Sequence, residues 1–190
     1  TNLINMAQNL LRRNMWDTAA KAGLVLGAVS TVYMFISQFL GAEQMGGIFG
    51  SILNFLLWGA KFGGCIWLMM FFMKKFSAEN ETADNSATFR LGVLASFLSA
   101  LIFAAAYFAN IGYISADFYQ SQMEQVMQTM APQLDANTMT VMQETLQNLP
   151  QMMFWYNLIY CFIFGTLLSF ILSRNIPSKD PFADYKPDEQ

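Results

Sequence analysis

Histidine is absent from the sequence, so the side chain most often used as a general base, proton relay or nitrogen ligand for metals is missing. Charged residues make up only 12% of the 190 residues, about half the share of an average soluble domain. There are two cysteines, Cys65 and Cys161, for which we expect different depths in apolar segments and therefore no disulfide. No glycine loop that would cradle phosphate and no nucleophile beside a base is visible. We expect neither a cofactor nor an enzymatic activity.

Long apolar runs, by contrast, are abundant, and hydrophobic residues make up 55% of the chain. A bilayer core about 30 Å thick requires roughly 20 apolar residues per helix. Four runs meet this requirement: residues 22–40, 48–73, 91–113 and 153–172. The first eighteen residues are polar and mixed, so we expect no cleavable signal peptide. The sequence therefore predicts an all-α fold, an integral membrane four-helix bundle that occupies residues 1–175.

The basic residues predict the orientation of this bundle. Apart from Lys61, every lysine and arginine falls on one side of the four-span arrangement, whereas the two opposite loops carry only acids. By the positive-inside rule, both termini are expected to be cytoplasmic in an inner membrane. No basic patch with interleaved aromatics occurs away from the membrane flanks, so no nucleic-acid partner is expected.

The segment 114–151 is the largest predicted region outside the bilayer. Apolar side chains recur at helical spacing on both sides of Pro132, and Asp135 or Asn137 can cap a second helix. We expect an extracytoplasmic helical hairpin between the third and fourth spans, packed onto the outer end of the bundle. The stretch 176–190 is predicted to be a disordered cytoplasmic tail. The N-terminal residues could form an amphipathic helix on the inner leaflet or a frayed extension of the first span.

Three of the spans carry small or weakly polar side chains at every fourth position. Such ladders allow close helix packing in lipid, where no hydrophobic effect drives association, and they predict a compact bundle. The ladders are Ala19, Gly23, Gly27, Thr31; then Gly92, Ser96, Ala100, Ala104; and then Asn157, Cys161, Gly165, Ser169, Ser173.

Lys61 is the one charged residue near the middle of a span, where a lysine costs roughly 2.5 to 3.5 kcal/mol. Helical periodicity places it on the small, polar face of the second span together with Asn54. Tyr33 and Tyr107 are expected at matching depth, and no span contains an acid. Lys61, Asn54, Tyr33 and Tyr107 are therefore the candidate ligand-binding residues. Three interpretations stay open: a solvated, hydroxyl-bonded or neutral lysine, an anion or lipid head-group site, or proton or ion coupling.

Gly59 and Gly63 face the opposite side of the same span. A glycine pair exposed to lipid is a groove into which another helix can pack, and we interpret it as a partner-docking site. The alternative is that these glycines are tolerated, or that they contact a neighbouring span.

Two other clusters carry less weight. Met123, Met127 and Met130 could offer three thioethers to Cu(I), although any packing helix has this spacing, so no metal site is assigned. Asp117 and Glu124 are interpreted as solvated charges rather than an acid pair.

The segments "DTAAKAGLVLGAVSTVYMFI", "WLMMFFMKKFS", "TFRLGVLASFLSALI" and "RNIPSKDPF" resemble the bacterial family called domain of unknown function 4199. The resemblance covers nearly the whole chain. It implies a four-span inner-membrane protein without an established activity and without catalytic residues to carry over. It also implies an accessory role beside a polyprenyl-phosphate glycosyltransferase, since genes for the two are often neighbours.

Together these features predict a non-enzymatic multi-pass membrane protein of the bacterial inner membrane. Its expected role is that of an accessory or scaffold partner of another membrane protein, with membrane lipids bound and with a homo-oligomer or a membrane enzyme as partner. The alternative is a small carrier or presenter of an amphipathic anion that uses the intramembrane lysine.

Overall fold

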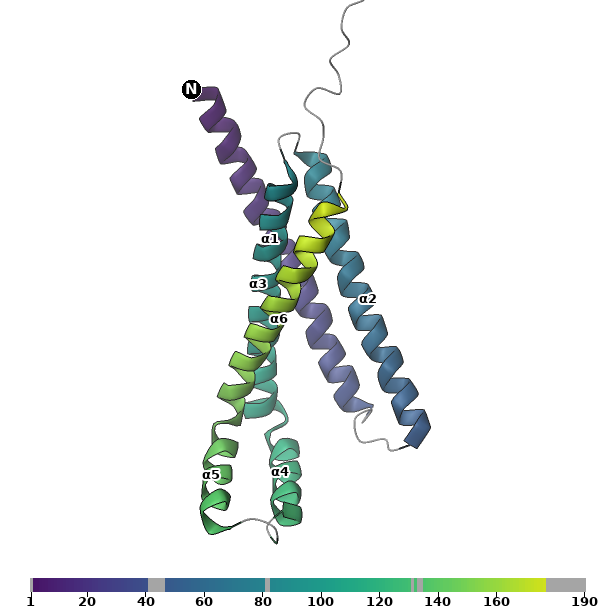
Figure 1. The fold of residues 1–190 in the computed structure, drawn as a ribbon, viewed down its shortest axis with the longest axis vertical. Helices are drawn as coiled ribbons and strands as arrows, with labels where there is room; N and C mark the ends of the chain where they lie inside the picture. The colour runs from purple at the N-terminus through teal and green to yellow at the C-terminus, as the bar shows by residue number, and fades with distance from the viewer. Residues whose placement is uncertain (1, 41–46, 81–82, 131, 133–134, 177–190) are drawn as a thin grey trace, which may run out of the picture.

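The computed structural model describes residues 2–40, 47–80, 83–130, 132 and 135–176, and these residues are helical with short connections (Figure 1). In this part of the chain there is no strand, so the all-α prediction is confirmed. The elements are α1 (Asn2–Phe39), α2 (Gly47–Glu79), α3 (Asn85–Ala109), η1 (Asn110–Ile114), α4 (Ala116–Met130), α5 (Ala136–Gln147) and α6 (Leu149–Arg174).

Four of these helices, α1, α2, α3 and α6, are long and apolar enough to cross a membrane. Each of the four predicted spans overlaps one of them, and the third continues into η1. All four helices begin before their apolar runs, most of all α1. The N-terminal stretch is thus a continuation of the first span rather than a separate helix. The predicted tail lies almost entirely outside the described residues.

The long helices run alternately up and down, so that the start of α1 and the end of α6 lie at the same end of the molecule (Figure 1). The end of α2 and the start of α3 lie there too. All four helices meet at this end in an apolar core, which contains Ala19, Met73, Phe76, Leu91 and Leu172. We call it the shared end.

Away from the shared end, α2 separates from α3 and α6. In the most apolar 18-residue window, 39% of α3 is buried and 33% of α1, but only 6% of α2. Its side chains toward Gly47 are open, with Ile48 81% and Phe55 69% exposed. Figure 1 shows the lower end of α2 well away from α3 and α6. The predicted compact bundle is therefore wrong for this half of α2, because α2 contributes no small-residue ladder to the packing.

The predicted ladders of small residues form the contacts among α1, α3 and α6. A Cβ added to Gly23 would lie 2.6 Å from the Cβ of Leu98, and one added to Gly27 would lie 2.9 Å from the Cβ of Ile102. Backbones this close can be packed only where one helix lacks a side chain. The ladder of α1 thus serves as its contact surface for α3.

The contact between α3 and α6 is reciprocal. Gly92 of α3 faces Ser169 of α6, and Gly165 of α6 faces Ser96 of α3, with added Cβ atoms 2.6 and 2.5 Å from the serine Oγ atoms. Each serine donates a hydrogen bond to the carbonyl oxygen four residues earlier, at 2.7 Å for Ser96 and 2.6 Å for Ser169. The hydroxyls are satisfied within their own helices, so they can be buried against each other.

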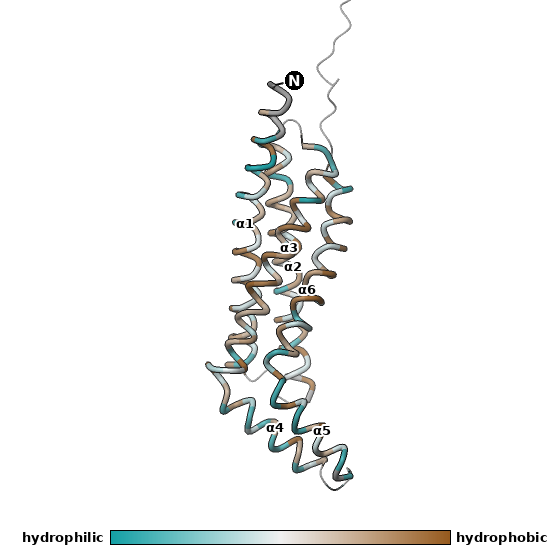
Figure 2. Tube along the Cα trace, turned by 90° about the vertical axis from the view of Figure 1, so that its left-hand side faces the viewer, coloured by the Kyte–Doolittle hydropathy of each residue, from teal (hydrophilic) through white to brown (hydrophobic). Residues whose placement is uncertain are grey.

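Helices α4 and α5 lie beyond the lower ends of α3 and α6 and are more polar than the four long helices (Figure 2). The side chain of Asp135 accepts a hydrogen bond from the Thr138 amide at 2.9 Å. Asp135, one of the two predicted capping residues, is therefore the N-cap of α5. This bond lowers the pKa of the Asp135 carboxyl below its ordinary value. Helix α4 has no buried residue. The helices α4 and α5 therefore project from the end of the bundle and do not pack closely onto it.

Candidate functional site

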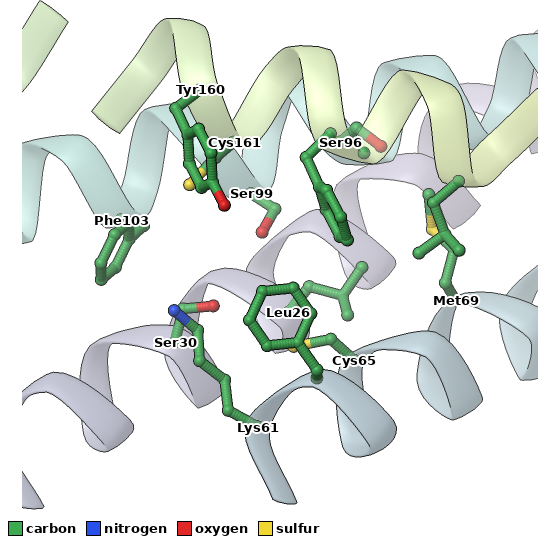
Figure 3. A pocket seen from close by; sticks show the side chains of 14 residues that line it. Leu26, Ser30, Lys61, Cys65, Met69, Ser96, Ser99, Phe103, Tyr160 and Cys161 are labelled. Carbon is green, nitrogen blue, oxygen red and sulfur yellow. The ribbon is translucent and has the colours of Figure 1, made fainter. Parts of the chain in front are cut away.

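Lys61 lines a partly open cavity of about 100 Å³ between α1, α2, α3 and α6. All four long helices contribute to its wall, which is mainly apolar (Figure 3). The residue lies about 21 Å along α2 from Gly47 and about 27 Å from Glu79, at 1.5 Å per residue. The side chain points into the space between the helices instead of running along α2 toward either membrane surface.

The ammonium group of Lys61 lies over aromatic rings of two neighbouring helices. Its Nζ atom is 4.9 Å from the ring centroid of Tyr33 on α1 and 5.0 Å from that of Phe103 on α3. Cation–π contacts contribute about 0.5 to 2 kcal/mol each, more where water is excluded. The structure thus brings Lys61 and Tyr33 together, and it adds Phe103, which the sequence reasoning did not select.

Hydroxyl groups supply the other polar atoms of the cavity. Ser30, Ser99 and Tyr160 line it, and Figure 3 shows the Ser99 and Tyr160 oxygens directed toward its interior. No aspartate or glutamate is among the lining residues. The ion pair found in the described part of the chain joins Lys75 and Glu79, 3.8 Å apart on the exposed end of α2. The ammonium group of Lys61 therefore lies against ring faces, in a cavity whose wall contains hydroxyls and no carboxylate.

None of the other three candidate ligand-binding residues is part of the cavity wall, although the Tyr33 ring contacts Lys61. Asn54 is partly buried and precedes Lys61 by two helical turns, about 10 Å. Tyr107 packs on Phe103, with ring centroids 5.8 Å apart, one turn further toward η1. Of the polar face predicted for α2, Lys61 lines the cavity, but Asn54 does not.

Both cysteines line this same cavity, so the expectation that they lie at different depths was wrong. Lys61 lines the cavity together with both thiols. The prediction measured depth from the ends of the apolar runs, but α2 extends beyond its run to Glu79. Counted from the shared end, Cys65 and Cys161 stand at nearly equal depth. Both are free thiols.

Gly59 and Gly63 lie on the exposed side of α2, with no atom within 4 Å of an added Cβ at either position. Neither glycine contacts a neighbouring span, which removes one of the alternatives left open by the sequence. The contrast with Gly23, Gly27, Gly92 and Gly165 is sharp, because each of those is filled by another helix. Whether a partner docks at Gly59 and Gly63 stays a prediction.

A second polar cluster, which sequence reasoning missed, surrounds Asn110 in the π-turn η1. The side chain is fully buried and donates from Nδ2 to Gln38 Oε1 of α1 at 2.9 Å. Its Oδ1 accepts a bond from the Ser115 hydroxyl at 2.9 Å, and Tyr119 of α4 lies 3.4 Å away. Asn110 thus ties α1, α3 and α4 together at the end away from the shared core. An asparagine at the end of an apolar run was the signal that could have identified it.

The remaining candidates are separate from the cavity. Met123, Met127 and Met130 lie on α4, as do Asp117 and Glu124. Among the described residues, no group of three or more histidine, cysteine, aspartate or glutamate side chains could hold a metal ion. The thioether alternative for copper stays a prediction.

A family model described as "Protein of unknown function (DUF4199)" matches residues 21–174. No curated protein and no solved structure matches the chain. The matched segment includes all four long helices except the first part of α1, and it includes every residue of the cavity wall. The chain belongs to this family, and the resemblance noted in its sequence is confirmed.

Proposed function

We propose that this DUF4199 protein is a non-enzymatic multi-pass protein of the bacterial inner membrane that serves as an accessory partner of another membrane protein. The observation that carries the proposal is the open face of α2. A span whose side chains toward Gly47 are largely exposed, and that leaves Gly59 and Gly63 uncovered, has a surface suited to another transmembrane helix.

The proposed orientation has the shared end and both termini in the cytoplasm and α4 and α5 outside as an extracytoplasmic hairpin. Lys74, Lys75, Arg90 and Arg174 lie at the shared end, whereas α4 and α5 contain acids and no lysine or arginine. This distribution follows the positive-inside rule. Reagents that do not cross membranes should label a cysteine placed at Gln143 on intact cells and should leave one placed at Lys75 unlabelled.

The proposed occupant of the α2 face is one transmembrane helix of a partner enzyme. The gene neighbourhood implied by the family resemblance favours an enzyme that handles polyprenyl phosphates, such as a polyprenyl-phosphate glycosyltransferase. Glycines spaced by four residues allow a partner helix to approach closely, and the exposed aromatic side chains Trp58 and Trp67 on the same helix add contact area.

Photo-crosslinking from position 63 tests this docking. A benzophenone amino acid in place of Gly63 should yield a crosslinked species in native membranes. Its mass should equal that of the chain plus one larger protein, and therefore exceed that of two copies of the chain. The matched control carries the same probe at Ile159, which is 55% exposed on α6 at similar depth. Equal products from both positions, or a dimer of the chain alone, would contradict docking of a partner enzyme.

A second candidate function is favoured by one separate observation, the cavity at Lys61. A lone ammonium group in an apolar, hydroxyl-containing space between four spans is suited to an amphipathic anion. In this role the protein is a small carrier or presenter of that anion. Native mass spectrometry of the gently extracted protein should then show a co-purifying anionic lipid that is lost in Lys61→Met.

A further inference from the structure

We infer that the cavity at Lys61 binds the carboxyl end of a single-chain fatty acid. This inference rests on the second candidate function and specifies its ligand class. It is independent of the docking proposed for α2, since Lys61 and the pair of Gly59 and Gly63 lie on different sides of that helix.

The charges of the wall select an anion of a single charge. Lys61 is its one basic side chain, and Ser30, Ser99 and Tyr160 add hydroxyl donors without any carboxylate acceptor. A carboxylate beside an ammonium forms a neutral pair, which costs far less in an apolar layer than either ion alone. A phosphate monoester carries about −1.5 to −2 at pH 7 and would leave net negative charge in the cavity.

The size of the cavity limits how much of the ligand enters. About 100 Å³ corresponds to roughly three water-sized groups, whereas sites for whole drug-sized ligands span about 300 to 1,000 Å³. A carboxyl group with the first methylenes of its chain fits this space.

We place the rest of the ligand's alkyl chain along the apolar wall on the side of α2 and α6. The rings of Phe62 on α2 and Phe164 on α6 meet edge to face, with centroids 5.2 Å apart, in the cavity wall on that side. Phe164 and Tyr160 are also 39% and 50% exposed, so this wall borders the bilayer directly. An alkyl chain that leaves here continues among lipid tails, which neither strains the protein nor exposes the chain to water.

The route of entry also favours a carboxylic acid. Near its titration range a fatty acid is in part uncharged, and an apolar surrounding increases this share. The uncharged acid crosses the apolar layer, and its O–H proton leaves to solvent as the carboxylate pairs with the ammonium group of Lys61. The step needs no oxidant or other reactant.

The test uses the full chain in phosphatidylcholine nanodiscs with three probes that share a 16-carbon chain: [1-¹³C]palmitic acid, hexadecanol and hexadecyl phosphate. The carboxyl resonance reports bound palmitate directly, and the other two are measured as competitors. We expect unlabelled palmitate to displace the bound labelled palmitate at least ten times more effectively than hexadecanol does. Lys61→Met should lose palmitate, while Lys74→Met, which changes an exposed lysine of the same helix, should bind it as the native chain does.

A further variant separates loss of the ligand from loss of the fold. Ser99→Leu fills the cavity while Lys61 is kept, and it should also abolish palmitate binding with the circular dichroism unchanged. Equal displacement by hexadecanol and palmitate, or unchanged binding in Lys61→Met, would overturn the inference. Stronger binding of hexadecyl phosphate would overturn the carboxylate class alone and leave the anion-presenting function standing. Absence of binding for both anions would refute the inference and that candidate function together.

Discussion

The contact of α3 with α6 and the contact of α2 with the rest of the bundle follow opposite rules. In the first, Gly92 and Gly165 are each filled by a serine of the other helix along an apolar layer. In the second, large side chains such as Met73 and Phe76 meet at one end, while the glycines Gly59 and Gly63 face outward. The difference shows that the placement of glycines, rather than apolar content, decides which spans stay together in lipid.

This comparison also explains where the cavity lies. Helix α3 packs closely on both α1 and α6, whereas α2 departs from α3 and α6 beyond the shared end and leaves a volume at Lys61 between itself and the other three helices. A lysine is tolerated there because ring faces and hydroxyls surround it. The rigid three-helix part and the divergent fourth helix together form the site.

The largest expected effect comes from filling a glycine of the tight contact. Gly165→Leu forces a side chain into the space of Ser96 and should destabilise the protein by about 3 kcal/mol, measured by reversible unfolding in mixed micelles. Gly63→Leu is the matched control, with nothing within 4 Å, and should change stability little. If the two substitutions cost the same, the distinction between the two contacts is unfounded.

The next effect concerns the polar cluster at the far end. Asn110→Leu leaves Gln38 and Ser115 without their partner in a buried place, and it should cost about 2 kcal/mol. Amide hydrogen exchange should rise first in η1 and the start of α4. Gln120→Leu, on the exposed side of α4, is the control. Unchanged exchange in Asn110→Leu would mean that apolar packing alone holds this end.

A smaller effect is expected from Ser96→Ala. The mutation removes the contact of 3.4 Å between the Ser96 and Ser169 hydroxyls but keeps the close approach of the backbones. Interhelical hydrogen bonds in membranes contribute about 0.6 kcal/mol on average, and we expect a loss of this size in the same unfolding assay. A loss several times larger would show that the hydroxyls, rather than the glycines, hold α3 to α6.

The smallest effect is local and depends on pH. Because the pKa of Asp135 is lowered in the folded chain, its stabilisation of α5 is complete above the ordinary carboxyl pKa and is lost as the pH falls through the lowered value. Amide exchange of α5, corrected for intrinsic rates, should therefore increase at acid pH in the native chain. In Asp135→Ala it should be raised already at neutral pH and change less with acid. The four long helices should not respond in either protein.

Residue patterns predicted the tight half of the molecule well. Period-four small residues identified the contact surfaces of α1, α3 and α6, because this contact geometry depends on few atoms and repeats along a helix. Helical periodicity also placed Lys61 toward the other spans and Gly59 and Gly63 away from them, and the structure agrees. Asp135 was recognisable as a cap from its position after a proline-containing break.

The divergent half could not be predicted in the same way. A span without a ladder of its own gives no signal for the angle at which it leaves the bundle, so the open lower half of α2 was missed. Because α2 extends beyond its apolar run, Cys65 lies at nearly the same depth as Cys161. Helical periodicity does not predict how far a helix extends. The burial of Asn110 depends on Gln38, 72 residues away, and a local pattern cannot report such a contact.

The divergence of α2 is the claim on which both the cavity and the docking face depend, and spin-label distances in bilayers test it most directly. In a background with both cysteines changed to serine, one label pair at Lys75 and Arg174 reports the shared end, and another at Phe55 and Tyr156 reports the opposite half. The account predicts a short, narrow distance distribution for the first pair and a clearly longer one for the second. Equally short, narrow distributions for both pairs would show a closed four-helix bundle and contradict it.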